Sequence, residues 1–277
     1  MRQALVGPAW DCHAHVFGPY DRYPLAQDRA YTPPEALLSH YIELIHRLGL
    51  THGVLVQPSM YGQDHALLLD VLAQTPALRG VAVLGPDATA RLKGWRSQGI
   101  RGLRYSHRSA SGNFVGSASL DDMQHMATAL ADEGLHAELW TDCQALVAIE
   151  KTLMDLPIPL VIDHMGGFDV GAGVRDPGFQ CLLRLLESGK VWVKLCAYRN
   201  LLASGDWAAG KPFHQALLQA NPDRLLWGTD WPHLRVNPAP DTQQLLSLFT
   251  EWTGDEAKIQ KILQVNPMAL YLSLIHI

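Results

Sequence analysis

The chain has 277 residues, of which 48% are hydrophobic and 18% charged, enough apolar material to fill the core of one large domain. A formal charge of −5 and an isoelectric point near 6.2 argue against a nucleic-acid partner. No segment reaches the roughly 20 apolar residues of a membrane span, and residues 1–7 lack the apolar core of a secretory signal. We therefore expect a cytoplasmic protein with no membrane partner, and the subunit count stays open.

Short apolar runs alternate along the chain with longer amphipathic segments that carry apolar residues at i, i+3 and i+4. Strands are predicted at residues 11–15, 53–57, 80–84, 100–105, 135–140, 159–164, 191–195 and 224–229. Helices are predicted at residues 34–48, 64–74, 120–133, 143–154, 179–188 and 213–220. Alternation of this kind predicts parallel strands joined by crossover helices.

Eight such units are typical of an α/β fold of the TIM (β/α)8 barrel type, although a doubly wound open sheet has the same periodicity. No Ser-rich linker, low-complexity run or repeat divides the chain. One domain over residues 1–277 is therefore expected, with residues 273–277 as a tail. Both architectures place their sites at the carboxyl ends of parallel strands, so the residues that follow each strand are the first candidates for function.

The first predicted strand, residues 11–15 (DCHAH), carries two histidines. Strict alternation along a strand puts Asp11, His13 and His15 on one face. A Gly-Pro pair ends the strand just beyond, so both imidazoles are expected near its carboxyl end. Taken alone, this motif fits two solvated histidines on an edge strand as well as it fits a site.

Ionisable side chains also end other predicted strands. Arg104 ends the fourth strand, with Arg108 in the loop that follows; His164 ends the sixth strand, and Asp230 follows the eighth. Each has an ordinary explanation on its own, such as a surface ion pair, a core histidine or a loop carboxylate. Their recurrence at one end of a parallel sheet, beyond strand interiors that are almost wholly apolar, favours a shared site.

The chemistry of this set is coherent. Three imidazoles can polarise a carbonyl group or hold a divalent metal, and a carboxylate opposite them can take a proton from water, which is the equipment of a hydrolase. Guanidinium groups at neighbouring strand ends can bind a substrate carboxylate through two parallel hydrogen bonds. The sequence therefore predicts an enzyme that acts on a small anionic substrate.

The same residues resemble the amidohydrolase superfamily and, within it, the 2-pyrone-4,6-dicarboxylate hydrolase group of lactonases, from about residue 10 to residue 272. The superfamily likeness is carried by HAH at 13–15, IDHMG at 162–166 and GTDWPH at 228–233. The lactonase likeness is carried by DCHAHVFGP at 11–19, RAYTPP at 29–34 and VQPS at 56–59. The resemblance implies a distorted TIM barrel that opens a carboxylated lactone ring with water.

The resemblance also implies roles for individual residues. Asp230 would be the general base that activates water and then returns the proton to the leaving oxygen. His13, His15 and His164 would polarise the lactone carbonyl and stabilise the oxyanion that develops on it. The residues that it offers for binding substrate carboxylates are Tyr31, Ser59, Arg104, Arg108 and Arg199.

Two departures from the lactonase pattern concern the substrate. Trp140 ends the fifth strand where we expect a tyrosine, so one hydrogen bond to the substrate is expected to be absent. Arg104 and Arg108 are also spaced more tightly than in those lactonases. The fold and the hydrolytic chemistry tolerate these changes, whereas the identity of the lactone depends on them.

The 2-pyrone-4,6-dicarboxylate lactonases work without a metal, so the resemblance favours a site with no cofactor. If a divalent metal such as zinc is bound, His13, His15, His164 and Asp230 would hold it. The alternative activities are a zinc-dependent decarboxylase of the aminocarboxymuconate-semialdehyde type and a sugar-lactone isomerase. A barrel that only binds small acids is disfavoured, because an aspartate beside three imidazoles is costly to keep for binding alone.

Overall fold

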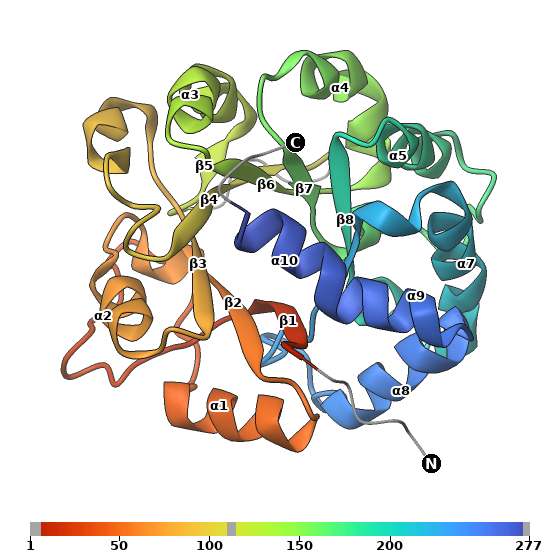
Figure 1. Cartoon of the computed structure of the whole chain (residues 1–277), viewed down its shortest axis with the longest axis horizontal. Helices are drawn as coiled ribbons and strands as arrows, with labels where there is room; N and C mark the ends of the chain where they lie inside the picture. The colour runs from red at the N-terminus through yellow and green to blue at the C-terminus, as the bar shows by residue number, and fades with distance from the viewer. Residues whose placement is uncertain (1–6, 110–114, 274–277) are drawn as a thin grey trace.

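Parallel strands form a ring in the order in which they occur along the chain (Figure 1). The strands of the ring are β1 (Trp10–Ala14), β2 (His52–Val56), β3 (Leu78–Ala82), β4 (Ile100–His107), β6 (His136–Thr141), β7 (Leu160–Ile162), β8 (Val191–Leu195) and β9 (Leu225–Trp227). A further strand, β5 (Ala118–Ser119), pairs with β4 outside the ring.

The structure, a computed structural model, describes residues 7–109 and 115–273. Of the predicted tail at 273–277, all but the first residue lies outside them.

The ring closes between β9 and β1. The backbone N–H of Asp230 donates to the carbonyl of His13 at 2.8 Å, and β1 forms a parallel bridge with the segment that follows β9. The Asp11 carboxylate adds a side-chain connection, because it accepts from the N–H of Thr229 at 2.8 Å and from its hydroxyl at 2.7 Å. The fold is therefore a nearly closed, TIM-like barrel in one α/β domain, and the open-sheet alternative does not apply.

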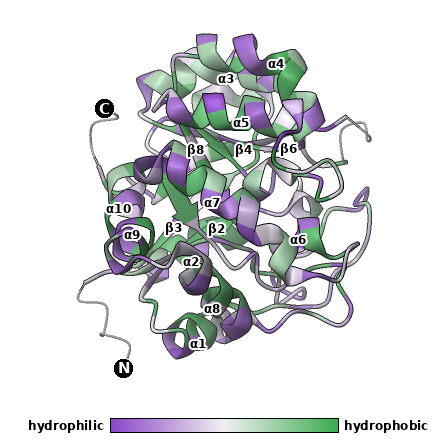
Figure 2. Cartoon of the chain, turned by 90° about the vertical axis from the view of Figure 1, so that its right-hand side faces the viewer, coloured by the Kyte–Doolittle hydropathy of each residue, from purple (hydrophilic) through white to green (hydrophobic). Residues whose placement is uncertain are grey.

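Helices surround the barrel and turn their polar faces outward, while the strands inside are hydrophobic (Figure 2). The α-helices are α1 (Leu38–Arg47), α2 (Ala66–Gln74), α3 (Leu120–Asp132), α4 (Cys143–Asp155), α5 (Pro177–Glu187), α6 (Tyr198–Leu201), α7 (Lys211–Ala220), α8 (Thr242–Thr253), α9 (Glu256–Gln260) and α10 (Asn266–Tyr271). Short 3-10 helices are η1 (Ser59–Tyr61), η2 (Pro86–Leu92), η3 (His164–Gly167), η4 (Trp207–Gly210) and η5 (Pro222–Arg224), and η6 (Lys261–Val265) is a π-helix. None of the described helices combines the length and the apolar character needed to cross a membrane.

The first helix starts later than the sequence indicates. The pattern predicts a helix over residues 34–48, but α1 begins at Leu38 because Ala36 is extended and pairs with Phe17. Phe17 N donates to Ala36 O at 2.8 Å, and Ala36 N donates to Phe17 O at 3.0 Å. The other predicted helices agree closely with α2, α3, α4, α5 and α7.

The barrel interior at the amino ends of the strands is lined mainly by apolar side chains, with the buried ring of His136 beside Tyr271 as an exception. Side chains such as Trp10, Val54 and Leu226 fill it, and α10 lies across this end of the barrel with Tyr271 packed among them (Figure 1). The ring of Tyr271 stacks on that of Trp10 with the centroids 5.9 Å apart. This end is therefore closed, and polar groups inside the barrel gather toward the opposite, carboxyl end.

A β-bulge in β1 decides which of its side chains face the interior. One extra residue of β1 lies between the pairs Asp11–Gly53 and Ala14–Leu55. The insertion reverses the alternation, so Asp11 faces outward toward α1 while both histidines of the motif face the interior. The prediction that Asp11 shares a face with His13 and His15 is therefore wrong for Asp11.

Candidate active site

The three histidines and Asp230 converge at the carboxyl end of the barrel. Asp230 Oδ1 lies 3.4 Å from His15 Nε2 and 3.8 Å from His13 Nε2, and Asp230 Oδ2 lies 3.5 Å from His164 Nε2. All four side chains are buried, although they come from β1, from the residue directly after β1, from η3 after β7 and from the segment after β9. The barrel therefore brings together residues that are up to 217 positions apart (230 − 13) in the sequence.

Two of these residues have unusual backbone conformations. His164 and Asp230 have φ angles of +50° and +55°, in the left-handed region that non-glycine residues rarely adopt. Each costs on the order of 1 kcal/mol, and such strain is found where surrounding contacts hold a functional side chain in place. The backbone of Asp230 is held in this conformation by the hydrogen bond from its N–H to the carbonyl of His13, where the barrel closes.

The two carboxylate oxygens of Asp230 have different surroundings. Oδ2 accepts hydrogen bonds from the Tyr198 hydroxyl at 2.8 Å and from Arg199 Nε. Burial by itself raises the pKa of Asp230, but the charge of Arg199, together with His164, holds that pKa well below its usual range. Asp230 is therefore ionised at neutral pH, with Oδ2 occupied by two donors and Oδ1 turned toward the imidazoles.

The ring of His15 has a defined tautomer. Its Nδ1 lies 2.7 Å from the carbonyl oxygen of Val56, which can only accept, so Nδ1 carries the hydrogen. Burial lowers the pKa of His15, so the neutral ring presents a lone pair at Nε2. That lone pair faces Asp230 Oδ1 across 3.4 Å. Two acceptors that face each other favour a water proton or a cation between them.

A layer of buried charges lies against His13. His13 Nδ1 is 3.1 Å from Lys194 Nζ and 3.2 Å from Asp163 Oδ1; Lys194 also pairs with Glu138, and Arg104 pairs with Asp163 at 2.9 Å. Burial, assisted by Lys194, holds the pKa of His13 well below its usual range, so its ring is neutral. Burial and the charge of Asp163 raise the pKa of Glu138. The layer fixes the ring of His13 from its Nδ1 side.

Sequence reasoning identified this layer only in part. Lys194, inside the predicted strand at residues 191–195, pairs with Glu138 as a fully buried side chain. The sequence pattern does not identify Asp163 and Tyr198 as parts of the site. The position of Asp163, one residue before His164 at the end of a strand, is a signal that could have identified it; α6 and its Tyr198 offered no pattern of comparable strength.

A cavity of about 320 Å³ opens above Asp230. The predicted substrate-binding residues that line it are Tyr31, Ser59, Arg104 and Arg199. Arg108 is not among the described residues that line it; its guanidinium lies over the ring of Trp140 at 5.0 Å and 3.9 Å from Asp142. Trp140 itself lines the cavity, as does Arg235, which sequence reasoning missed because it follows no predicted strand end directly.

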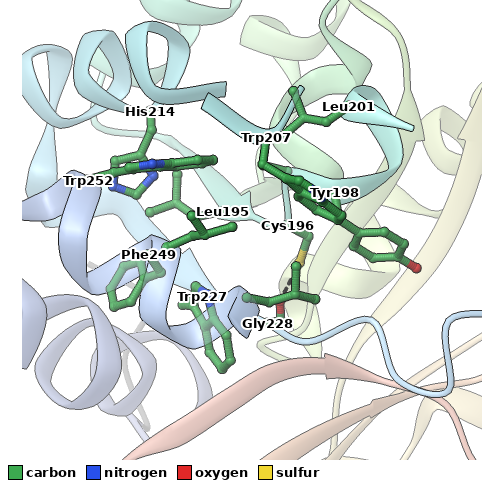
Figure 3. A pocket seen from close by; sticks show the side chains of 13 residues that line it. Leu195, Cys196, Tyr198, Leu201, Trp207, His214, Trp227, Gly228, Phe249 and Trp252 are labelled. Carbon is green, nitrogen blue, oxygen red and sulfur yellow. Dashed lines mark hydrogen bonds between the residues drawn. The ribbon is translucent and has the colours of Figure 1, made fainter. Parts of the chain in front are cut away.

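A second, apolar cavity of about 30 Å³ lies outside the barrel wall, bordered by β8, β9, α6 and α8 (Figure 3). Its walls include Trp227 and Trp252, and Cys196 Sγ donates to the carbonyl of Gly228 beside it. Tyr198 borders this cavity with its ring, while its hydroxyl points away from Trp252 (Figure 3). A space this small has room for no more than a water molecule or two, so the larger cavity is the candidate substrate site.

The donors at the barrel mouth fit a divalent metal. His13, His164 and Asp230 each offer one atom, all within 4.8 Å of one another, and His13 Nε2 and both ring nitrogens of His164 form no hydrogen bond with the residues that the structure describes. Imidazole nitrogen and carboxylate oxygen are ligands that zinc accepts. A second group of donors consists of His13, Glu138 and Asp163. Both of its carboxylates already pair with the ammonium group of Lys194, so the first group suits a metal better.

Comparison with known proteins agrees with this architecture. The amidohydrolase family model Amidohydro_2 matches residues 10–272, and the chain belongs to this family. The resemblance found in the sequence is thereby confirmed, and the barrel mouth with its histidines and aspartate is the part of the family fold in which the candidate site lies.

Particular relatives include several proteins that act on lactones. A 4-sulfomuconolactone hydrolase of Rhizobium radiobacter is 33% identical over 97% of this chain and 91% of its own length. A 2-pyrone-4,6-dicarboxylate hydrolase of Comamonas testosteroni is 31% identical over 96% and 91%. A D-galactarolactone isomerase of Agrobacterium fabrum is 27% identical over 95% and 90%.

A solved structure is also similar over nearly the whole chain. It is an Acinetobacter baumannii protein described as a probable 2-pyrone-4,6-dicarboxylic acid hydrolase, with citric acid bound. The TM-score is 0.82 at 27% identity, covering 96% of this chain and 100% of that one. The barrel and its helices therefore follow those of a structure that holds a small polyacid.

Proposed function

We propose that this protein hydrolyses a small carboxylated lactone, either 2-pyrone-4,6-dicarboxylate or a related ring, with water activated by Asp230. The observation that carries the proposal is the asymmetry of the Asp230 carboxylate. Oδ2 is held by Tyr198 and Arg199, while Oδ1 faces the acceptor Nε2 of His15. A water molecule that donates one hydrogen to each of these two acceptors is oriented to lose a proton to Oδ1. The lactone hydrolases among the relatives support the same reaction class.

The proposed reaction has two proton transfers. Asp230 Oδ1 takes a proton as the water oxygen bonds to the lactone carbonyl carbon, and an imidazole N–H of His13 or His164 stabilises the oxyanion. The ring C–O bond then breaks, and Asp230 returns its proton to the leaving oxygen. The product carries one more carboxylate than the substrate. A divalent metal held by His13, His164 and Asp230, with His15 beside them, would add Lewis-acid polarisation of the carbonyl when bound.

The test is turnover of lactones by the purified protein. We expect loss of ring absorbance with 2-pyrone-4,6-dicarboxylate, 4-sulfomuconolactone or a close analogue, and a decrease in kcat of about 10²- to 10⁴-fold in Asp230→Asn. Asp132→Asn, which changes an exposed carboxylate at the end of α3, is the matched control and should retain activity. An Asp230→Asn variant that keeps wild-type kcat contradicts the proposed role of Asp230.

Two rival activities are separated by their products. Hydrolysis in H₂¹⁸O places one heavy oxygen in the product carboxylate, whereas lactone isomerisation incorporates none, which matters because one relative is an isomerase. A decarboxylase releases carbon dioxide and loses activity when zinc is removed. Metal analysis, followed by assay after chelation, tests whether the donors His13, His164 and Asp230 hold an ion that turnover requires.

A further inference from the structure

Three guanidinium groups of the described residues line the substrate cavity, and two of them already have buried partners. Arg104 pairs with Asp163 through Nε at 3.1 Å and Nη2 at 2.9 Å. Arg199 pairs with Asp230 through Nε. Their positive charges offset carboxylates of the site itself, so they add little net charge with which to attract a substrate.

Arg235 differs from both. Within residues 7–109 and 115–273, no carboxylate forms an ion pair with its guanidinium, and its side chain is exposed at the rim of the cavity. Its φ angle of +62° is in the left-handed region, a strained conformation for arginine. The preceding residue is held in place, because Arg199 Nη1 donates to the carbonyl of Leu234 at 3.1 Å. The loop that carries Arg235 is thus hydrogen-bonded to Arg199, which also pairs with Asp230.

Tyr31 lies directly beside Arg235. The guanidinium carbon is 5.5 Å from the centroid of the phenol ring, and both residues line the cavity. Burial raises the pKa of Tyr31, so its hydroxyl keeps its hydrogen at neutral pH and can donate. Leu202 and Val236 add apolar side chains to the cavity lining. The rim therefore offers a guanidinium that forms no ion pair with the described carboxylates, and one hydroxyl donor, beside apolar side chains.

We propose that Arg235, with Tyr31, forms a subsite for a second anionic group of the substrate, a carboxylate or a sulfonate on a flat ring. The inference rests on the proposed function, because it concerns the ligand that enters the same cavity. A guanidinium binds either group through parallel N–H donors, and an arginine without a carboxylate partner loses no ion pair when it does so. The subsite makes Arg235 a specificity-determining residue that favours dianionic over monoanionic ligands.

Isothermal titration calorimetry with unreactive aromatic acids tests the subsite. Benzoate carries one anionic group, while isophthalate and 3-sulfobenzoate add a carboxylate or a sulfonate on the same ring. We expect the wild type to bind at least one diacid more tightly than benzoate. Arg235→Gln should weaken binding of that diacid by about 10- to 100-fold, the range for a charged hydrogen bond, with benzoate unchanged. Arg235→Lys should recover part of the affinity.

Arg47→Gln is the matched control, because Arg47 is an exposed arginine at the carboxyl end of α1, on the opposite end of the barrel from the cavity. A loss with isophthalate alone or with 3-sulfobenzoate alone supports the subsite and identifies the group that it takes. Equal binding of benzoate and both diacids by the wild type, or equal losses for all three acids in Arg235→Gln, overturns it. Failure of lactone turnover by a wild type that shows the expected binding pattern refutes the hydrolase and leaves the subsite standing.

Discussion

At the scale of single residues, Tyr198 shows how a side chain outside the predicted set controls one inside it. Its hydroxyl donates to Asp230 Oδ2 at 2.8 Å, and burial together with the charge of Asp230 raises its pKa, so it remains a donor. With Arg199 on the same oxygen, the carboxylate cannot rotate without losing two hydrogen bonds. Tyr198 is thus a positioning residue that presents Oδ1 to the water in the proposed reaction.

Removing this hydroxyl should impair catalysis more than folding. We expect Tyr198→Phe to lower kcat by about 10- to 100-fold, since a hydrogen bond to a charged group contributes about 1.5–3 kcal/mol, with a smaller change in KM. Tyr105→Phe is the matched control, because the buried Tyr105 hydroxyl has no hydrogen-bond partner among the described residues. Steady-state kinetics on both variants decides the matter, and equal kcat values for the two would refute the positioning role.

At the scale of elements, His214 shows how α7 and α8 are joined on the outer side of the barrel. The Thr253 hydroxyl donates to the carbonyl of Phe249 at 2.8 Å, so its oxygen accepts from His214 Nε2 at 2.9 Å. The His214 ring also packs edge-on against Trp252. Burial lowers the pKa of His214 to about 3, so the contact between the two helices depends on a neutral imidazole.

The lowered pKa of His214 makes the stability of the protein depend on pH. An unfolded histidine takes up a proton near pH 6.5, whereas folded His214 does so only near its pKa of about 3, so stability is lost as pH falls between these values. From pH 6.5 to pH 5 the loss is about 2 kcal/mol at 1.36 kcal/mol per unit. His214→Gln lacks this contribution. The difference in urea midpoint between wild type and variant should therefore shrink on going from pH 7 to pH 5, and a constant difference would contradict it.

At the scale of the whole molecule, the contacts of Asp11 hold the barrel closed. Its carboxylate accepts from the N–H and hydroxyl of Thr229, from the N–H of His13 at 3.1 Å and from the Tyr41 hydroxyl at 3.2 Å. One fully buried side chain therefore links β1, the segment after β9 and α1. The same closure brings Asp230 beside His13 and His15.

Loss of this carboxylate should destabilise the entire barrel. Asp11→Asn puts an amide NH₂ where an acceptor is required, and a buried donor left unsatisfied costs about 1–3 kcal/mol. We therefore expect the free energy of unfolding to fall by roughly 3 kcal/mol when the hydrogen bonds of this carboxylate are disrupted. Thr229→Ser keeps the hydroxyl and should cost less. Urea denaturation of both variants measures the effect. A near-wild-type midpoint for Asp11→Asn would show that backbone bonds alone close the ring.

The sequence by itself determined the order of the eight ring strands and of six α-helices, and it identified the four residues at the barrel mouth. Hydrophobic period and the local position of a residue after a strand are properties of short segments, so His13, His15, His164 and Asp230 could be proposed without coordinates. The limits of α1 could not be predicted, because its start depends on pairing between Phe17 and the distant Ala36.

Only the tertiary structure decided the outward turn of Asp11, the exclusion of Arg108 from the cavity and the inclusion of Arg235. The outward turn of Asp11 depends on one extra residue in β1 relative to β2, and the sequence of β1 alone does not show it. The others depend on which carboxylates reach which guanidinium groups, since Arg108 lies near Asp142 whereas Arg235 has no such partner among the described residues. Ion pairing is a property of neighbours in space, and the closed barrel supplies those neighbours from segments that are remote in sequence.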